Sequence, residues 1–386
     1  MLKLNIVADE NILLLDEFFA SIANITKVDG RAIQPHQVEH ADALVLRSTA
    51  QITPKLLQAS KVEFVGTCTI GIDHLDTAYM DANDIVWRNA PGCNAEGVVD
   101  YAISAINHAW QVHGIDPREA TIGVIGAGNV GGRLIKRLQA AGLNVICSDP
   151  PKQASPQPLD LPYVSLDELL ETADIVSLHT PLTKSGTDAT LNLLNKNLIQ
   201  SLRPGSVLIS VGRGEVVEQP ALLQRLQNHH DLFVYLDVWQ QEPNVDPAIA
   251  PYCQIATPHI AGHSLEGKVR GTEMIYQSLC QHFALPITQT LAPLLPEAAA
   301  LQLGVGASSD AKMILNAAVN SVYNITQDAD RTRKTLSMQA SDQVAREFDK
   351  LRKHYPIRRE FSTFTVTGVE CIEDKKLLSG LGFQVS

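Results

Sequence analysis

Short apolar runs alternate with segments of helical periodicity over most of the chain. In the first part these runs predict strands at 4–7, 43–46, 62–65 and 85–87. Later runs predict strands at 121–125, 144–147, 174–178, 206–211, 232–236 and 254–257, with helices between them. Strands that alternate with helices are typical of parallel sheets. We therefore predict a small α/β unit followed by a larger, doubly wound parallel sheet.

Helical spacing at 94–111 and 262–283 predicts two helices that connect these units, and a proline- and alanine-rich stretch after them marks a boundary. The remainder predicts helices at 312–329 and 337–354, a β-like run at 361–366 and a final apolar run at 381–385. This organisation predicts three domains. They are a smaller α/β domain of the flavodoxin type (1–93, completed by 260–287), a nucleotide domain of the Rossmann type (94–259) and a C-terminal α+β domain (288–386).

A glycine-rich turn joins the strand at 121–125 to the helix that follows it. Gly126, Gly128 and Gly131 form the pattern G-x-G-x-x-G. The first glycine permits the tight turn, the second lets the backbone approach a pyrophosphate, and the third lets the helix lie close to the strand. The free amides at the start of the helix, near Asn129 and Val130, would then hold the phosphates.

An acid follows the next strand. Asp149 lies 18 residues after Gly131, where a carboxylate can accept both hydroxyls of an adenosine ribose. The negative charge favours NAD over NADP, because it would repel a 2′-phosphate. A glycine triplet alone is also compatible with an ordinary turn, but the strand, helix, second strand and acid all have the spacing of a dinucleotide site.

Composition narrows the class of protein. A chain of 386 residues with 45% hydrophobic residues is long enough for two or three domains with sizeable cores. The net charge of −11, without a basic block, argues against nucleic acid as a partner. Acidic residues interrupt the N-terminal segment, which predicts neither a signal peptide nor a membrane span. The six cysteines have no metal-binding spacing, so we expect a cytoplasmic protein with reduced thiols and no metal site.

Polar loops follow two strands of the first unit. Arg47, Ser48 and Thr49 follow one strand, and the segment 66–71, which contains Thr69, follows the next. Ligands of open parallel sheets bind beyond the carboxyl ends of the strands. Simple capping by the hydroxyl groups explains each of these residues equally well. Alternatively, Arg47 and the hydroxyls could hold a phosphate or a carboxylate.

Three further clusters follow strands of the second unit. They contain Arg213, the acids Asp237 and Glu242, and the histidines His259 and His263. A guanidinium can hold a substrate carboxylate, and an imidazole can take and return a proton near neutrality. Each residue also has a structural interpretation, as an ion-pair partner, a cap or a solvated loop residue. Their positions after successive strands of one sheet favour oxidation of an alcohol next to a carboxylate.

The strings GAGNVGG, VGRGEVV, LDVWQQEP and PHIAG occur in this order and resemble the D-2-hydroxyacid dehydrogenases. The resemblance covers about residues 1–283. It implies that Arg213, Glu242 and His259 act in catalysis. It also implies substrate contacts from Ser48, Thr69 and His263, and NAD contacts from Gly126, Gly128, Asn129, Val130, Gly131, Asp149, Thr180, Asp237 and Gly262. The chain departs from its expected relatives at His263, where a tyrosine is usual.

The string PHIAGHSLEGKVRGT, the two early loops and the C-terminal extension resemble one branch of this family, which oxidises 4-phospho-D-erythronate on the route to pyridoxal phosphate. The C-terminal part resembles the dimerisation domain of that branch, which implies a homodimer. The basic residues Arg352, Lys353, His354, Arg358 and Arg359 are interpreted as a solvated face. The alternative is that Arg358 or Arg359 reaches a partner's active site and pairs with the substrate phosphate.

Two other functions are compatible with the sequence. One is another phosphorylated D-2-hydroxyacid dehydrogenase, of the 3-phosphoglycerate type, with a regulatory C-terminal domain. The two long helices predicted after the boundary differ from the βαββαβ order usual for such a domain. The other is a non-catalytic NAD(H)-sensing protein, against which the presence of Arg213, Glu242 and His259 together argues.

Overall fold

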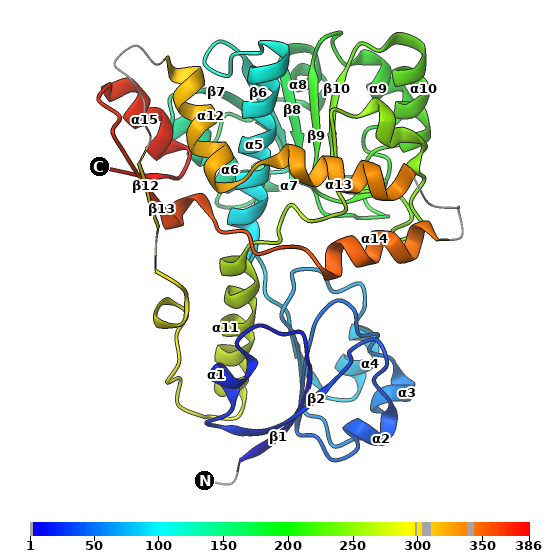
Figure 1. Ribbon diagram of the computed structural model, residues 1–386. Coiled ribbons are helices and arrows are strands. Elements are labelled where there is room, and N and C mark those ends of the chain that lie inside the picture. The colour runs from blue at the N-terminus through cyan, green and yellow to red at the C-terminus, as the bar shows by residue number, and fades with distance from the viewer. Residues whose placement is uncertain (1–2, 159, 298, 303–309, 338–342) are drawn as a thin grey trace. The chain divides into compact units, whose positions relative to one another are not determined.

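The computed structural model describes residues 3–158, 160–297, 299–302, 310–337 and 343–386 (Figure 1). The chain divides into two compact units. Unit 1 comprises Met1–Asn94 and Ser264–Glu297, and unit 2 comprises Ala95–His263 and Ala298–Ser386. Each unit has its own sheets and hydrophobic core. Among the described helices, none combines the length and apolar character needed to cross a membrane.

Unit 1 has a five-stranded parallel sheet with the order β2-β1-β3-β4-β5. This order is that of flavodoxin-like sheets, the type that the sequence analysis predicts for this unit. The strands are β1 (Leu4–Asp9), β2 (Ala23–Val28), β3 (Ala43–Leu46), β4 (Phe64–Thr67) and β5 (Val86–Arg88). The helices are α1 (Leu15–Phe19), α2 (Pro35–Val38), α3 (Pro54–Leu57), α4 (Thr77–Ala82) and α11 (Leu265–His282), and a 3-10 helix, η3 (Ala292–Leu294), follows them.

Helix α11 returns the chain to unit 1, as its spacing predicts. It lies so close to β4 that a Cβ atom at Gly66 would stand 2.3 Å from Cγ2 of Ile275. Glycine at that position therefore allows the helix to cover the sheet. Strand β2 was not predicted, because it lies at the edge of the sheet and its exposed polar residues interrupt the apolar pattern.

The main sheet of unit 2 is parallel and has the order β11-β10-β9-β8-β6-β7. Its strands are β6 (Thr121–Ile125), β7 (Asn144–Ser148), β8 (Ile175–Leu178), β9 (Val207–Ser210), β10 (Phe233–Leu236) and β11 (Ile255–Ala256). Tyr163 adds an isolated parallel bridge to Cys147 beyond β7. The strand order reverses between β6 and β8, and ligands of doubly wound sheets bind at such a reversal.

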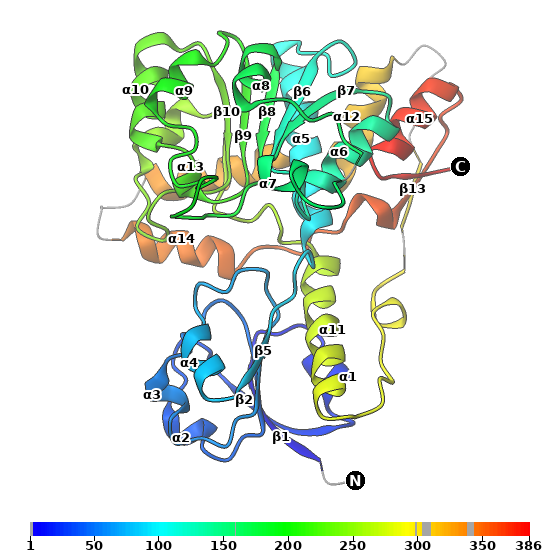
Figure 2. The ribbon, with the colours of Figure 1, turned by 180° about the vertical axis from the view of Figure 1, so that it is seen from behind.

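Helices cover both faces of this sheet (Figures 1 and 2). One core forms where α5 (Ala95–His113) and α6 (Gly131–Ala140) pack on the strands, and the other lies under α8 (Leu166–Thr172), α9 (Lys196–Ser201) and α10 (Gln219–His229). Helix α8 has an N-cap, since Ser165 Oγ accepts the Glu168 N–H at 3.1 Å. Three short helices complete the region: α7 (Pro150–Gln153), η1 (Gly214–Val216) and η2 (Pro247–Tyr252).

Where the structure describes it, the C-terminal region forms a small parallel sheet, β12-β13-β14, with four α-helices. The strands are β12 (Ala299–Gln302), β13 (Phe364–Thr367) and β14 (Gln384–Val385), and the helices are α12 (Ala311–Val322), α13 (Ile325–Ser337), α14 (Val344–Lys353) and α15 (Ile372–Gly380), with η4 (Phe361–Thr363) before β13. Most of its buried apolar residues share one core with α5 and α6, whereas Leu336, Val344 and Phe348 belong to the core under α8, α9 and α10. The region therefore belongs to the same compact unit as the main sheet.

Two helix predictions in this region need correction. The single helix predicted at 312–329 is wrong, because Tyr323 and Asn324 interrupt it and separate α12 from α13. Tyr323 has an extended backbone, and Asn324 Oδ1 accepts the Thr326 N–H at 3.1 Å at the start of α13. The helix predicted at 337–354 begins at Val344 instead, and its residues 338–342 lie outside the described part of the chain.

Candidate active site

The glycine turn follows β6 and precedes α6, at the reversal of the strand order. Gly126 has φ +89°, a conformation that favours glycine. A Cβ atom at Gly131 would lie 1.8 Å from the Gly126 carbonyl oxygen, so the helix could not approach the strand with any other residue there. At Gly128 a Cβ atom would meet no described atom within 4 Å beyond its chain neighbours. The turn is therefore closely packed where Gly131 meets Gly126 and open to a ligand at Gly128.

Two polar groups border this turn. Asp149, at the end of β7, accepts the Ala127 N–H at 2.7 Å and the Lys152 N–H at 2.9 Å, so its carboxylate is held beside the glycines. Thr180 follows β8, and its buried hydroxyl has no hydrogen-bond partner among the described residues. Buried polar groups are normally hydrogen-bonded, and an exception often marks a ligand site. Open glycines, a fixed acid and an unsatisfied hydroxyl fit a bound dinucleotide.

The predicted catalytic residues follow three adjacent strands. Arg213 follows β9, Glu242 follows β10, and His259 follows β11. Arg213 is half-buried, and its Nη1 donates to the Gly212 carbonyl at 2.9 Å. A Cβ atom at Gly214 would lie 1.9 Å from the Trp239 carbonyl oxygen, so the glycine after Arg213 allows the loops after β9 and β10 to touch.

Glu242 and His259 form a hydrogen-bonded pair. Oε2 of Glu242 lies 2.6 Å from Nδ1 of His259, and Oε1 accepts the Trp239 N–H at 2.9 Å. Burial alone would raise the pKa of the Glu242 carboxyl, but the His259 imidazole, the Trp239 amide and the charge of Arg352 together lower it. Glu242 is therefore a carboxylate at neutral pH. It orients the imidazole so that Nε2 is left for proton transfer.

Asp237 holds the backbone around His259 in place. Its carboxylate is fully buried and accepts the Thr257 hydroxyl at 2.6 Å and the N–H groups of Ile260 and Ala261 at 2.8 and 2.9 Å. His259 has φ +55°, a strained conformation for a residue with a side chain, and these bonds stabilise it. We name residues 257–263 the catalytic loop. Contact of Asp237 and Gly262 with NAD stays a prediction.

The candidate substrate residues lie in different parts of the structure. Ser48 is exposed at the end of β3, beside half-buried Arg47. Thr69 follows the neighbouring strand β4, and its hydroxyl lies 2.8 Å from that of Thr67. His263 belongs to unit 2, where its ring packs edge-on against Tyr355 with 5.6 Å between ring centroids. Their substrate contacts stay predictions.

The interpretation of the basic C-terminal residues as a solvated face is wrong for Arg358. Its side chain is buried, with 5% exposed, and Nη2 donates to the carbonyls of Gly97 and Ala261. Because these partners belong to the same chain, Arg358 does not reach into another subunit. Lys353 and His354 are exposed, as predicted. The sequence contains no local signal for this burial, since neighbouring cations have the same pattern whether solvated or covered.

The sequence analysis also missed Trp239. Its amide positions Glu242, and its indole N–H donates to the Thr257 carbonyl at 2.8 Å. An aromatic residue three positions after the end of a buried strand is the only sequence signal for this role, and it is equally typical of core packing.

The fold and these side chains together define an NAD-binding dehydrogenase of the doubly wound class. The family model described as D-isomer specific 2-hydroxyacid dehydrogenase, NAD binding domain, matches residues 95–261. A domain of unknown function matches residues 294–382. Solved structures share the fold. One is the NAD⁺-bound 3-phosphoglycerate dehydrogenase of Entamoeba histolytica, with TM-score 0.61 and 21% identity over 73% of this chain and 96% of that one.

Curated relatives are similar over nearly the whole chain. An erythronate-4-phosphate dehydrogenase of Pseudomonas fluorescens (strain Pf0-1) is 47% identical over 94% of each chain. The enzyme of the same name from Pseudomonas aeruginosa (strain UCBPP-PA14) is 44% identical over 99% of this chain and 100% of its own. The chain therefore belongs to the D-2-hydroxyacid dehydrogenases and, within them, to the erythronate-4-phosphate dehydrogenase family.

Proposed function

We propose that this chain oxidises 4-phospho-D-erythronate to (R)-3-hydroxy-2-oxo-4-phosphobutanoate with NAD, in pyridoxal 5′-phosphate (vitamin B6) biosynthesis. The observation that carries the proposal is the Glu242–His259 pair, with Arg213 on the adjacent strand end. The similarity to erythronate-4-phosphate dehydrogenases along almost the entire chain supports the choice of substrate.

Each catalytic residue has one role. NAD, when bound, supplies the acceptor for the hydride that leaves the carbon carrying the hydroxyl group. His259 takes the hydroxyl proton at Nε2, and Glu242 stabilises the imidazolium that forms. Arg213 holds the substrate carboxylate through two parallel hydrogen bonds, so that the reacting carbon stays in place. The glycine turn with Asn129 and Val130 holds the pyrophosphate, and Asp149 and Thr180 complete the cofactor site.

Ser48, Thr69 and His263 contact the substrate in this proposal. Arg47, next to Ser48 at the end of β3, is the candidate for the phosphate group, since Arg358 is buried elsewhere. The protein acts in the cytoplasm as a homodimer formed through the C-terminal region. Light scattering on the purified protein would measure its mass directly.

The experiment is NAD reduction by the purified protein with 4-phosphoerythronate, 3-phosphoglycerate and unphosphorylated erythronate in parallel. We expect turnover with the first. Turnover with 3-phosphoglycerate alone would instead assign the chain to the 3-phosphoglycerate type. NAD binding without turnover of any substrate would identify an NAD(H) sensor. His259→Asn should abolish turnover and leave NAD binding intact, and substantial residual turnover would remove His259 as the acid–base group.

A further inference from the structure

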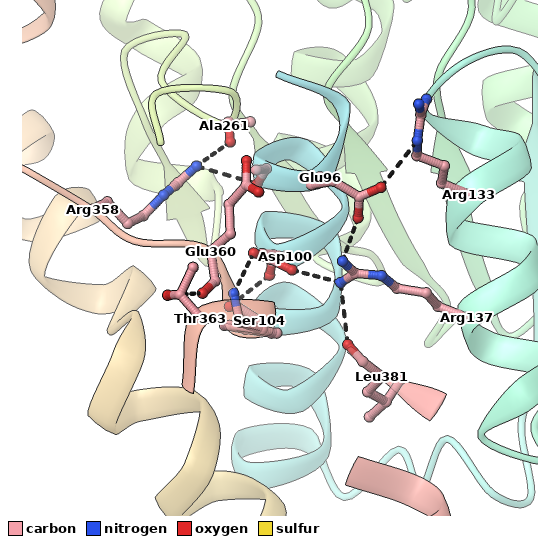
Figure 3. A network of polar contacts seen from close by, with 12 residues as sticks. Glu96, Asp100, Ser104, Arg133, Arg137, Ala261, Arg358, Glu360, Thr363 and Leu381 are labelled. Carbon is pink, nitrogen blue, oxygen red and sulfur yellow. Dashed lines mark hydrogen bonds and ion pairs between the residues drawn. The ribbon is translucent and has the colours of Figure 1, made fainter. Parts of the chain in front are cut away.

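A side chain of the C-terminal region reaches the catalytic loop. Arg358 precedes η4, and its guanidinium donates to the carbonyl of Ala261, two residues after His259. The same nitrogen donates to the Gly97 carbonyl in the first turn of α5 at 3.2 Å. Figure 3 shows the guanidinium directed at Ala261. One guanidinium thus links the catalytic loop to α5, the first helix of unit 2.

This contact completes the support of the catalytic loop. On the side of the sheet, Asp237 accepts the N–H groups of Ile260 and Ala261. The carbonyl of Ala261 is held by Arg358 instead. The peptide groups after His259 are therefore fixed by the Asp237 carboxylate, which follows β10, and by a guanidinium from the C-terminal region. Removal of either partner would leave the loop held from one side.

The guanidinium is itself held firmly. It lies over the ring of Tyr323, 4.4 Å from the centroid, and Tyr355 stands on a second side at 6.0 Å. The hydroxyls of both tyrosines donate to the same Asp328 oxygen, at 3.0 and 2.6 Å, which fixes the two rings. Because its position is fixed in this way, the guanidinium can hold the catalytic loop in one conformation.

Burial of the Arg358 charge lowers the stability of the folded protein, so filling space does not explain why an arginine is present here. Two of its nitrogens, Nε and Nη1, have no hydrogen-bond partner among the described residues. Unpaired buried donors reduce stability, and apolar residues often replace buried charges without loss. The position of the cation at the catalytic loop gives it a role that an apolar side chain could not perform, because such a side chain cannot hold two carbonyls.

The segment after Arg358 is connected to the nucleotide site as well. The Phe361 N–H donates to Asp100 of α5 at 2.9 Å, and Asp100 accepts Arg137 of α6 at 2.7 Å (Figure 3). Arg137 also pairs with Glu96 and donates to the Leu381 carbonyl at 3.2 Å. Residues 358–361 therefore contact the catalytic loop directly and are linked through Asp100 and Arg137 to α6, the helix that begins at the glycine turn.

We propose that Arg358 is a positioning residue for the dehydrogenase reaction, through which the C-terminal region holds the catalytic loop, and with it His259 and Gly262, in the geometry that binds NAD and substrate. This inference rests on the proposed function. It gives the region matched by a domain of unknown function a role inside its own subunit.

The test compares Arg358→Met and Arg358→Lys with Arg331→Met in the full-length protein. Arg331 is the matched control, because it pairs with the same Asp328 and its guanidinium lies 5.8 Å from the ring centroid of Tyr355, but among the described residues its hydrogen bond goes to Asp328 and not to the loop. The measurements are kcat and KM for 4-phosphoerythronate, and the Kd of NAD from fluorescence titration. Circular dichroism confirms that each variant is folded.

We expect Arg358→Met to lower kcat by about 10- to 100-fold, the loss typical of a misplaced catalytic group, and to raise the Kd of NAD. Arg358→Lys should recover part of the loss. A further variant, Arg358→Ala, leaves space for a small guanidinium. Millimolar methylguanidinium should restore its activity and leave the wild-type activity unchanged. Arg331→Met should stay within about twofold of wild type. A folded Arg358→Met protein with wild-type kcat and wild-type Kd would overturn the proposal.

The test also has a clear result if Arg358→Met does not fold or if the wild-type protein is inactive. If Arg358→Met does not fold, Arg358→Lys, which keeps the buried charge, decides by the same criteria. If the wild-type protein itself turns over none of the substrates, the proposed function fails. The Kd of NAD still tests the positioning role in that case, because Gly262 lies in the loop that Arg358 holds. An unchanged Kd in a folded Arg358 variant would then reject it.

Discussion

Nδ1 of His259 lies 2.6 Å from Oε2 of Glu242, although the two residues are 17 positions apart in the chain. The distance follows from the sheet, since β10 and β11 are parallel neighbours and each residue follows one of them. The Trp239 amide holds the second carboxylate oxygen, so Glu242 can present only one side to the imidazole. The pair is therefore preorganised before any ligand binds.

Glu242→Gln tests this pair. An amide can still accept the Trp239 N–H but cannot stabilise a protonated imidazole, so we expect kcat to fall by about 10²- to 10⁴-fold. The Kd of NAD should change little, because Glu242 is assigned no cofactor contact. Steady-state rates and fluorescence titration measure the two quantities. Glu215→Gln is the control. Oε1 of Glu215 accepts the Gln241 N–H at 3.4 Å, and an amide oxygen can still accept this bond, so the variant should keep its activity. Equal rates for wild type and Glu242→Gln would refute the role.

Asp149→Asn tests the choice of cofactor. Asparagine keeps one acceptor oxygen for the turn but removes the charge that would repel a 2′-phosphate. We expect KM for NAD to rise several-fold and the ratio of kcat/KM for NADP to that for NAD to increase by about tenfold or more. Asp167→Asn, at the exposed start of α8, should leave the ratio as in wild type. An unchanged ratio in Asp149→Asn would show that the acid does not select the cofactor.

Asp237→Asn tests the support of the catalytic loop. One amide oxygen cannot accept all three donors, and its NH₂ group would face a backbone N–H. An unsatisfied buried donor costs about 1–3 kcal/mol, so Tm should fall by several degrees. Thr257→Ser, which keeps the hydroxyl bonded to Asp237 and Tyr101, is the control and should cause a smaller shift. Calorimetry measures both. A larger loss in Thr257→Ser than in Asp237→Asn would contradict this account.

Asp100→Asn tests a pH dependence of stability. Burial raises the pKa of the Asp100 carboxyl to about 7, although the Arg137 guanidinium and the Phe361 amide oppose the shift. Because the folded pKa lies above the unfolded one, the folded protein binds a proton that the unfolded chain has lost between about pH 4 and 7. Stability therefore decreases as pH rises through this range, by up to about 1.4 kcal/mol per pH unit.

In Asp100→Asn that contribution disappears. The free energy of unfolding of the variant, relative to wild type, should thus increase from pH 5 to pH 7 and stay level above about pH 8. Denaturant midpoints followed by tryptophan fluorescence at each pH measure the difference. Parallel pH profiles for the two proteins would show that the carboxyl of Asp100 does not titrate in this range.

Much of the fold could be predicted because its strands are continuous apolar runs. The predictions at 43–46 and 121–125 coincide with β3 and β6, which are buried on both faces. Prediction failed where local pattern and packing diverge. The edge strand β2 has a weak apolar signal, and the helix predicted at 312–329 contains a polar cap at Asn324 that breaks it.

The amino-acid sequence by itself determined which chemical groups are present and the order in which they follow the strands. Glycine spacing, an acid after the second strand, and Arg213, Glu242 and His259 after later strands are local features, and short-range sterics and hydrophobic periodicity make them readable. Only the tertiary structure decided that Glu242 meets His259 and that Arg358 is buried against the catalytic loop. Both depend on partners far along the chain, and the local pattern around a charged residue is the same whether water or protein surrounds it.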